Sequence, residues 1–113
     1  MNIIATNADR DNKKEFYALT KSSATNVKDI PEGSYDVDKY CIYEDVDSNG
    51  EIKEVVVFID TDGTKYASVS RTFKREFTDI IDIMGNEKFS ILVKKGKARN
   101  GREYVTCELD TTK

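Results

Sequence analysis

Few side chains in this sequence could carry out ordinary nucleophilic or acid–base chemistry. The chain has 113 residues, no histidine and two cysteines, Cys41 and Cys107. Without histidine, Ser-His-Asp catalysis, Cys-His catalysis and every His-ligated zinc site are excluded. Both cysteines fall in segments that alternate like strands, so we expect them to be small buried thiols. We therefore expect no catalytic residue, no metal site and no cofactor.

Two acidic segments have spacings that invite a chemical interpretation. The apolar stretch ending at Asp60 and Asp62 resembles the nucleophile motif of haloacid-dehalogenase-type phosphatases, and residues 45–50 match the first six positions of an EF-hand loop. The phosphatase motif needs a parallel sheet with crossover connections, but only 49 residues follow Thr64. Position twelve of the calcium loop should be a bidentate Glu and is Val56. We therefore interpret both segments as hairpin turns.

Charge is distributed unevenly along the chain. The total of 18 Lys+Arg and 21 Asp+Glu gives a net charge of −3. Residues 1–64 carry 7 basic and 14 acidic side chains, whereas residues 65–113 carry 11 and 7. Five cations fall within nine residues that contain no acid: Lys94, Lys95, Lys97, Arg99 and Arg102. Such a run indicates either a solvated loop or a surface for a polyanion.

The periodicity of apolar residues predicts mostly strands. Alternation indicates strands over residues 34–44, 52–60, 64–69, 88–95 and 102–110. The alternation slips near Asp38 and Lys39, which indicates a β-bulge. Turns are predicted at Asn49-Gly50 and at residues 61–63. Helical spacing begins after Ser70, a predicted N-cap, and ends at Gly85, so a helix is expected over about residues 71–84.

This order of elements predicts a mainly β protein, a five-stranded OB-fold barrel with one helix between strands three and four. Residues 15–20 are compatible with a short extra N-terminal strand, and residues 1–14 with a flexible arm or an added edge segment. Residues 15–113 are expected to form one domain. No apolar run is long enough to span a bilayer and no signal peptide is recognisable, so we expect a cytoplasmic protein with no membrane contact.

The predicted hairpin after residue 60 determines which side chains share a face. A three-residue loop with Gly63 in the left-handed conformation pairs Phe58 with Tyr66 and Val57 with Ala67. We expect the face that carries Val57 to be core. The face that carries Phe58 and Tyr66 is then expected to meet solvent, where OB-folds bind oligonucleotides.

This face and the basic loop between the last two strands together predict a nucleic-acid site. Bases stack on aromatic rings while cations follow the phosphates of a single strand. The candidate residues are four aromatic and six basic side chains: Tyr43, Phe58, Lys65, Tyr66, Lys94, Lys95, Lys97, Arg99, Arg102 and Tyr104.

Four segments carry a family resemblance: residues 30–33, 62–70, 78–82 and 89–109. In order and spacing they resemble the single-stranded-DNA-binding proteins of small Gram-positive phages with protein-primed replication, over roughly residues 27–110. The resemblance implies a non-enzymatic replication protein that coats and protects displaced strands in the host cytoplasm, with replication proteins as further partners. By analogy, strand-face tyrosines stack on bases, which maps best onto Tyr66.

A second hypothesis comes from a different functional class. A small phage-type OB-like protein could instead bind and inhibit a host protein, with its acidic first half acting as a mimic of nucleic acid. The salt dependence of binding to a labelled oligothymidylate discriminates between the two hypotheses.

Overall fold

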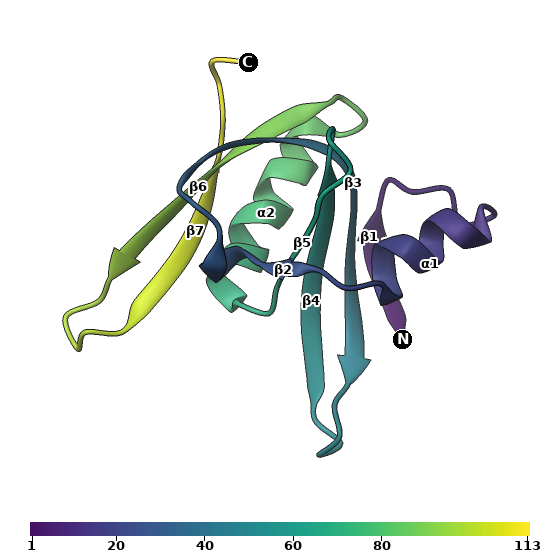
Figure 1. The fold of residues 1–113 in the computed structure, drawn as a ribbon, viewed down its shortest axis with the longest axis horizontal. Helices are drawn as coiled ribbons and strands as arrows, with labels where there is room; N and C mark the ends of the chain where they lie inside the picture. The colour runs from purple at the N-terminus through teal and green to yellow at the C-terminus, as the bar shows by residue number, and fades with distance from the viewer.

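The secondary structure is dominated by strands arranged around one central helix (Figure 1). A computed structural model describes residues 1–113. Its elements, in chain order, are β1 (Asn2–Thr6), α1 (Lys13–Lys21), β2 (Thr25–Asn26), the 3-10 turn η1 (Val27–Asp29), β3 (Gly33–Val46), β4 (Ile52–Asp60), β5 (Lys65–Ser68), α2 (Arg71–Met84), β6 (Phe89–Lys97) and β7 (Glu103–Leu109).

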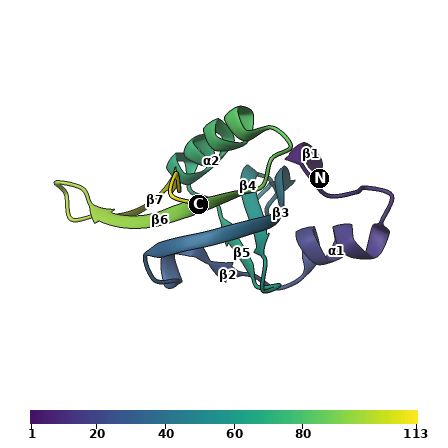
Figure 2. The ribbon, with the colours of Figure 1, turned by 90° about the horizontal axis from the view of Figure 1, so that it is seen from above.

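All the strands belong to one sheet, which curls around α2 (Figures 1 and 2). The strand order is β2-β5-β4-β3-β6-β7, and β1 pairs with β3 outside this path. The long strand β3 organises the sheet, because its first part pairs with β6 and its later part with β4. Strands β5 and β7 do not pair with each other, and η1 contacts both of them.

The fold is therefore mainly β and OB-like, but the predicted five-stranded barrel is wrong in two respects. The sheet has seven strands rather than five and is an open half-barrel rather than a closed one. A second helix, α1, is present where residues 15–20 were read as an extra strand. The extra strands β1 and β2 both lie in the N-terminal quarter of the chain.

The β3-β4-β5 meander agrees with its prediction in detail. Strand β4 has the predicted bounds, and the register shift in β3 falls between Val37 and Lys39, as the slip in alternation predicted. Phe58 pairs with Tyr66. The turn glycine between these strands, Gly63, has a φ of +86°, the left-handed conformation that the turn type requires.

Helix α2 also agrees with its predicted range. The Ser70 hydroxyl accepts a hydrogen bond from the Phe73 backbone N–H at 3.3 Å, which caps the first turn. At the other end, Gly85 has a φ of +60° and its N–H donates to the Ile81 carbonyl at 3.0 Å. The apolar stripe of this helix is buried in the concave side of the sheet.

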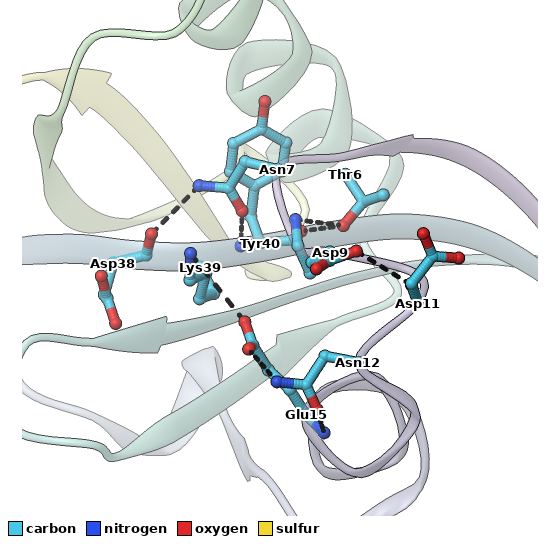
Figure 3. Close-up of polar contacts among 10 residues, drawn as sticks. Thr6, Asn7, Asp9, Asp11, Asn12, Glu15, Asp38, Lys39 and Tyr40 are labelled. Carbon is cyan, nitrogen blue, oxygen red and sulfur yellow. Dashed lines mark hydrogen bonds and ion pairs between the residues drawn. The ribbon is translucent and has the colours of Figure 1, made fainter.

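Helix α1 begins at a cap that the strand prediction overlooked. The Asn12 side-chain oxygen accepts from the Glu15 N–H at 3.2 Å, and the Asn12 amide donates back to the Glu15 carboxylate at 3.1 Å (Figure 3). This reciprocal pair resembles a capping box. Phe16, Leu19 and Thr20 then lie on one helical face, which packs on the sheet. The strand prediction for this segment is therefore wrong.

The sheet buries side chains on both of its faces. The larger core has 17 buried residues and lies between α2 and the face that carries Val56, Phe58 and Tyr66. A second cluster of five buried residues includes Leu19 of α1 and Val57 of the opposite face. The prediction that the Phe58–Tyr66 face meets solvent is therefore wrong, although its register is correct, because each face is covered by a different helix.

The N-terminal residues 1–14 do not form a free arm, since β1 pairs with β3. The predicted alternative of an added edge segment describes them. The Asn7 amide donates to the Asp38 carbonyl at 3.0 Å and accepts from the Tyr40 N–H at 2.8 Å (Figure 3). These two bonds lie on either side of Lys39, where the bulge disturbs the regular pairing of β3. The side chain of Asn7 thus fastens the N-terminal segment to the bulge.

Candidate nucleic-acid interface

The β6–β7 hairpin projects beyond the core at one end of the molecule (Figures 1 and 2). The last buried residues along it are Val93 and Val105, at 1% and 5% exposure. Its tip is closed by hydrogen bonds from the Ala98 N–H to the Arg102 carbonyl and from the Gly101 N–H to the Ala98 carbonyl, both 2.9 Å. The hairpin therefore ends in a hydrogen-bonded turn at residues 98–102, all of which are exposed.

Most cations of this hairpin have no acidic partner. Lys94 lies 3.0 Å from Glu108, whereas Lys95, Lys97, Arg99 and Arg102 form no ion pair and are exposed. The basic run therefore lies on the exposed ends of β6 and β7 and the turn between them, with four of its five cations outside any ion pair. An unneutralised cationic surface attracts phosphates, and the attraction falls as salt rises.

The pleat of the hairpin divides the predicted basic and aromatic residues between two faces. Lys95 pairs with Val105, so its side chain shares the face that continues the core. Lys97 lies on that same face, two residues further along β6. Tyr104 pairs with Gly96 and shares the opposite face with Lys94. The inner face therefore carries Lys95 and Lys97 together with Glu103, which pairs with Lys97, and the outer face carries Lys94 and Tyr104.

A pocket of about 440 Å³ lies beside the hairpin and includes a residue that the sequence did not suggest. It is lined by Lys28, Lys95, Gly96, Lys97, Glu103, Tyr104 and Val105. The ammonium group of Lys95 donates to the carbonyl of Lys28 at 2.8 Å, which joins η1 to β6. Lys28 is 67 residues away in sequence, so no local pattern connects it with the basic run.

Tyr104 is the exposed member of the four candidate aromatics, with 45% of its surface accessible. Its phenol lies across Gly96 on the neighbouring strand: a Cβ atom added at Gly96 would be 2.5 Å from both Cζ and Oη of Tyr104. The ring therefore lies close against the glycine, and it remains accessible to solvent.

The other three candidate aromatics are buried, so their predicted exposure is wrong. Phe58 is 0% exposed, in the core under α2. The Tyr43 hydroxyl donates to the Thr20 carbonyl of α1 at 3.1 Å, and burial raises the pKa of Tyr43. The Tyr66 hydroxyl donates to the Asp60 carboxylate at 3.0 Å, and burial together with this bond raises the pKa of Tyr66. None of these three rings is presented to solvent for stacking in this structure.

Lys65 lies away from the hairpin and is engaged with α1. Its ammonium group donates to the carbonyls of Ala18 and Ser22 at 3.0 and 2.8 Å and to the Ser22 hydroxyl at 3.3 Å. Both carbonyls lie at the C-terminal end of the helix, where a cation is favourable. Partial burial lowers the pKa of Lys65. The structure thus gives Lys65 a helix-capping position rather than a place on the hairpin surface.

Carboxylates of the two acidic segments accept hydrogen bonds from backbone N–H groups of the turns in which they lie. The Asp47 carboxylate accepts from the N–H groups of Asn49 and Glu51 at 2.9 and 3.0 Å, and the bond from Glu51 is the largest cause of its lowered pKa. Asp60 accepts from the N–H groups of Asp62 and Thr64 at 3.0 and 2.9 Å. Strand β4 is antiparallel to both neighbours, which is not the parallel arrangement of a phosphatase motif.

The predicted burial of both cysteines is confirmed. Cys41 and Cys107 are free thiols with 0% and 1% exposure. Burial raises the pKa of both thiols, that of Cys107 to about 12. A thiol in this state is not a nucleophile at neutral pH.

A curled OB-like sheet, cationic side chains and an exposed aromatic ring are features that single-stranded nucleic-acid-binding proteins use. The sequence model of one family, described as phage single-stranded DNA-binding protein, matches residues 3–110, nearly the whole chain. The chain belongs to this family, and its role is single-stranded DNA binding in phage replication. The predicted resemblance is confirmed, and of the two hypotheses the match supports this one.

Comparison with curated proteins and with solved structures gave no match. Neither α1, with 9 residues, nor α2, with 14, has the length and apolar character needed to cross a membrane.

Proposed function

We propose that single-stranded DNA binds along the β6–β7 hairpin and that the protein coats displaced strands there without catalysing a reaction. The observation that carries this proposal is the group of unpaired cations beside the exposed ring of Tyr104. We further propose that coating takes place in the cytoplasm of the phage-infected host, in company with other replication proteins.

The division of the hairpin into two faces suggests how the strand lies. Phosphates contact the inner face, where Lys28, Lys95 and Lys97 line the pocket beside η1 together with Glu103 and Tyr104. A base stacks on Tyr104 on the other face. The strand therefore passes around the edge of the hairpin, with Arg99 and Arg102 at the tip available to the next phosphates.

The opposite charge of the second hairpin supports this path. Residues 44–54, around the β3–β4 turn, contain five acidic side chains and a single lysine, Lys53. In Figure 1 the β3–β4 and β6–β7 hairpins both project toward the lower side of the view. The acidic hairpin repels phosphates and so favours a strand that remains on the basic one.

The salt dependence of binding follows from the number of cations. Five phosphate contacts, from Lys28, Lys95, Lys97, Arg99 and Arg102, correspond to a slope of roughly −3.5 in log K against log salt, at about −0.7 per contact. A fourfold increase in salt then weakens binding by roughly 100-fold. Stacking on Tyr104 contributes ~1–3 kcal/mol that salt does not alter.

The test separates the two kinds of contact by mutation. Replacing Lys95 and Lys97 with Ala should weaken binding to a labelled oligothymidylate and flatten the slope by about 1.4, because two contacts are lost. Tyr104→Ala should weaken binding with the slope unchanged. The matched control is the double substitution Lys13→Ala and Lys14→Ala, which removes two cations at the start of α1. In Figure 1, α1 lies on the opposite side of the view from the β6–β7 hairpin.

Circular dichroism should show that all three variants are folded. If the Lys95/Lys97 variant keeps the parent's affinity and slope while the Lys13/Lys14 control loses both, the DNA lies on the α1 side and the proposed surface is wrong. If neither lysine pair affects binding, the strand avoids both surfaces and the proposal is also wrong.

A further inference from the structure

Gly96 stands in the middle of a regular ladder, where glycine is an unfavourable residue. It pairs with Tyr104 between the pairs Lys95–Val105 and Lys97–Glu103, with no irregularity in the register. Glycine loses more chain freedom on folding than other residues, so a strand interior is more stable with a side chain at this position. Its presence in β6 requires a local reason.

The backbone conformation does not supply that reason. Five glycines of the chain have positive φ values, namely Gly33, Gly50, Gly63, Gly85 and Gly101, and Gly96 is not among them. Alanine could therefore adopt the same backbone at position 96. The hairpin turn also lies outside it, at residues 98–102.

The neighbouring ring does supply a reason. The three heavy atoms nearest to a Cβ at position 96 would be Cζ, Oη and Cε2 of Tyr104, at 2.5, 2.5 and 2.9 Å. Carbon atoms do not approach so closely without a shift. Any side chain at position 96 would push the phenol away from the strand, so only glycine permits the ring to lie across β6.

We infer that Gly96 is a positioning residue, which lets the Tyr104 ring lie close against β6 and so presents the exposed part of the ring to a base. The inference rests on the proposed stacking of DNA on Tyr104. A Tyr104 ring that lies close against Gly96 loses little conformational freedom when a base stacks on it, because its position is already fixed. The ring displaced by a methyl group is exposed on both faces and has no fixed orientation.

The displaced ring has solvent to move into, which makes the inference testable in a folded protein. Gly96→Ala should leave the melting temperature equal to or above that of the parent, since alanine is more favourable in a strand than glycine. Its affinity for a labelled oligothymidylate should fall by roughly 5-fold or more, within the loss of roughly 5- to 150-fold expected for Tyr104→Ala. The slope of log K against log salt should not change, because no cation is removed.

A double-mutant cycle distinguishes a positioning role of Gly96 from a general structural effect of the substitution. In a Tyr104→Ala background the ring is absent, so Gly96→Ala should cause no further loss of affinity. Thr106→Ala is the control, because Thr106 is the next residue of β7 on the same face as Tyr104. It should bind like the parent.

Each outcome of the cycle has a distinct meaning. If Tyr104→Ala binds as tightly as the parent, the stacking in the proposed function is wrong and the role of Gly96 falls with it. If Tyr104→Ala weakens binding and Gly96→Ala does not, only the role of Gly96 is wrong. If Gly96→Ala weakens binding equally in both backgrounds, Gly96 acts on DNA directly and the positioning role is overturned.

Discussion

Replacing Tyr66 with phenylalanine tests whether this residue belongs to the core or to a DNA-binding surface, because the substitution removes only the hydroxyl oxygen. Its hydroxyl donates to the Asp60 carboxylate at 3.0 Å, and both residues are buried, at 8% and 9% exposure. Tyr66→Phe removes the hydroxyl and keeps the ring, including its edge contact with Tyr35 at 5.4 Å between ring centroids. Phenylalanine keeps the ring that base stacking needs but loses the hydrogen bond to Asp60. A loss of stability without a loss of affinity would therefore indicate a core position.

The expected loss follows from the bond that is removed. A hydrogen bond to a charged group contributes about 1.5–3 kcal/mol, and the Asp60 oxygen left behind is buried. The unfolding entropy of a chain of this length is about 0.24 kcal/mol per degree. The melting temperature of Tyr66→Phe should therefore fall by about 6–12 °C.

Thermal unfolding followed by circular dichroism measures this shift, and an oligothymidylate titration at low temperature measures affinity in the folded state. The matched control is Tyr17→Phe, since Tyr17 is 65% exposed on α1 and its loss should move the melting temperature by no more than about 2 °C. An unchanged melting temperature for Tyr66→Phe, together with weaker DNA binding, would refute the burial of this residue in the core.

Two further predictions concern groups outside the hairpin. Lys65→Met should lower stability by about 1–2 kcal/mol and speed amide exchange in the last turn of α1, because the helix loses its cap; a flatter salt dependence of DNA binding would instead place Lys65 on the DNA. Asp110 has its pKa lowered from 3.8 to about 2, chiefly by a hydrogen bond from Ser34 at 2.6 Å. Its charged form therefore stabilises the fold above pH 3.8, and this contribution is lost as the pH falls toward 2. Asp110→Asn should therefore reduce the dependence of the melting temperature on pH in this acid range. A dependence identical to that of the parent would contradict the assignment.

Elements that depend on interactions between residues close together in the chain were predicted correctly from sequence. Strand β4, helix α2, the bulge in β3 and the register of Phe58 with Tyr66 all follow from alternation, caps and turn residues within a few positions. Helix α1 had a comparable signal in Asn12 and Glu15, but its aromatic content was read as a strand. The seven-stranded sheet was not predicted, because β1 and β2 pair with strands far along the chain.

The assignment of faces failed for a physical reason. Val56, Phe58 and Tyr66 are apolar or aromatic, and so are Val55, Val57 and Ile59 on the opposite face. Alternation identifies the two faces but does not say which one a helix will cover, and here α1 and α2 cover one each. The hairpin cations were predicted as DNA contacts from their charge alone, without knowledge of packing, and that role stays a prediction. Lys28 was missed because only the folded chain brings it beside Lys95.

The separation of the hairpin tip from the core has an evolutionary consequence. Beyond Val93 and Val105 the side chains of β6 and β7 lie outside both buried clusters. If DNA binds there as proposed, substitutions there would alter DNA affinity with little effect on whether the chain folds. On the proposed function, a phage lineage could strengthen or weaken its hold on displaced strands without first acquiring compensating mutations in the core.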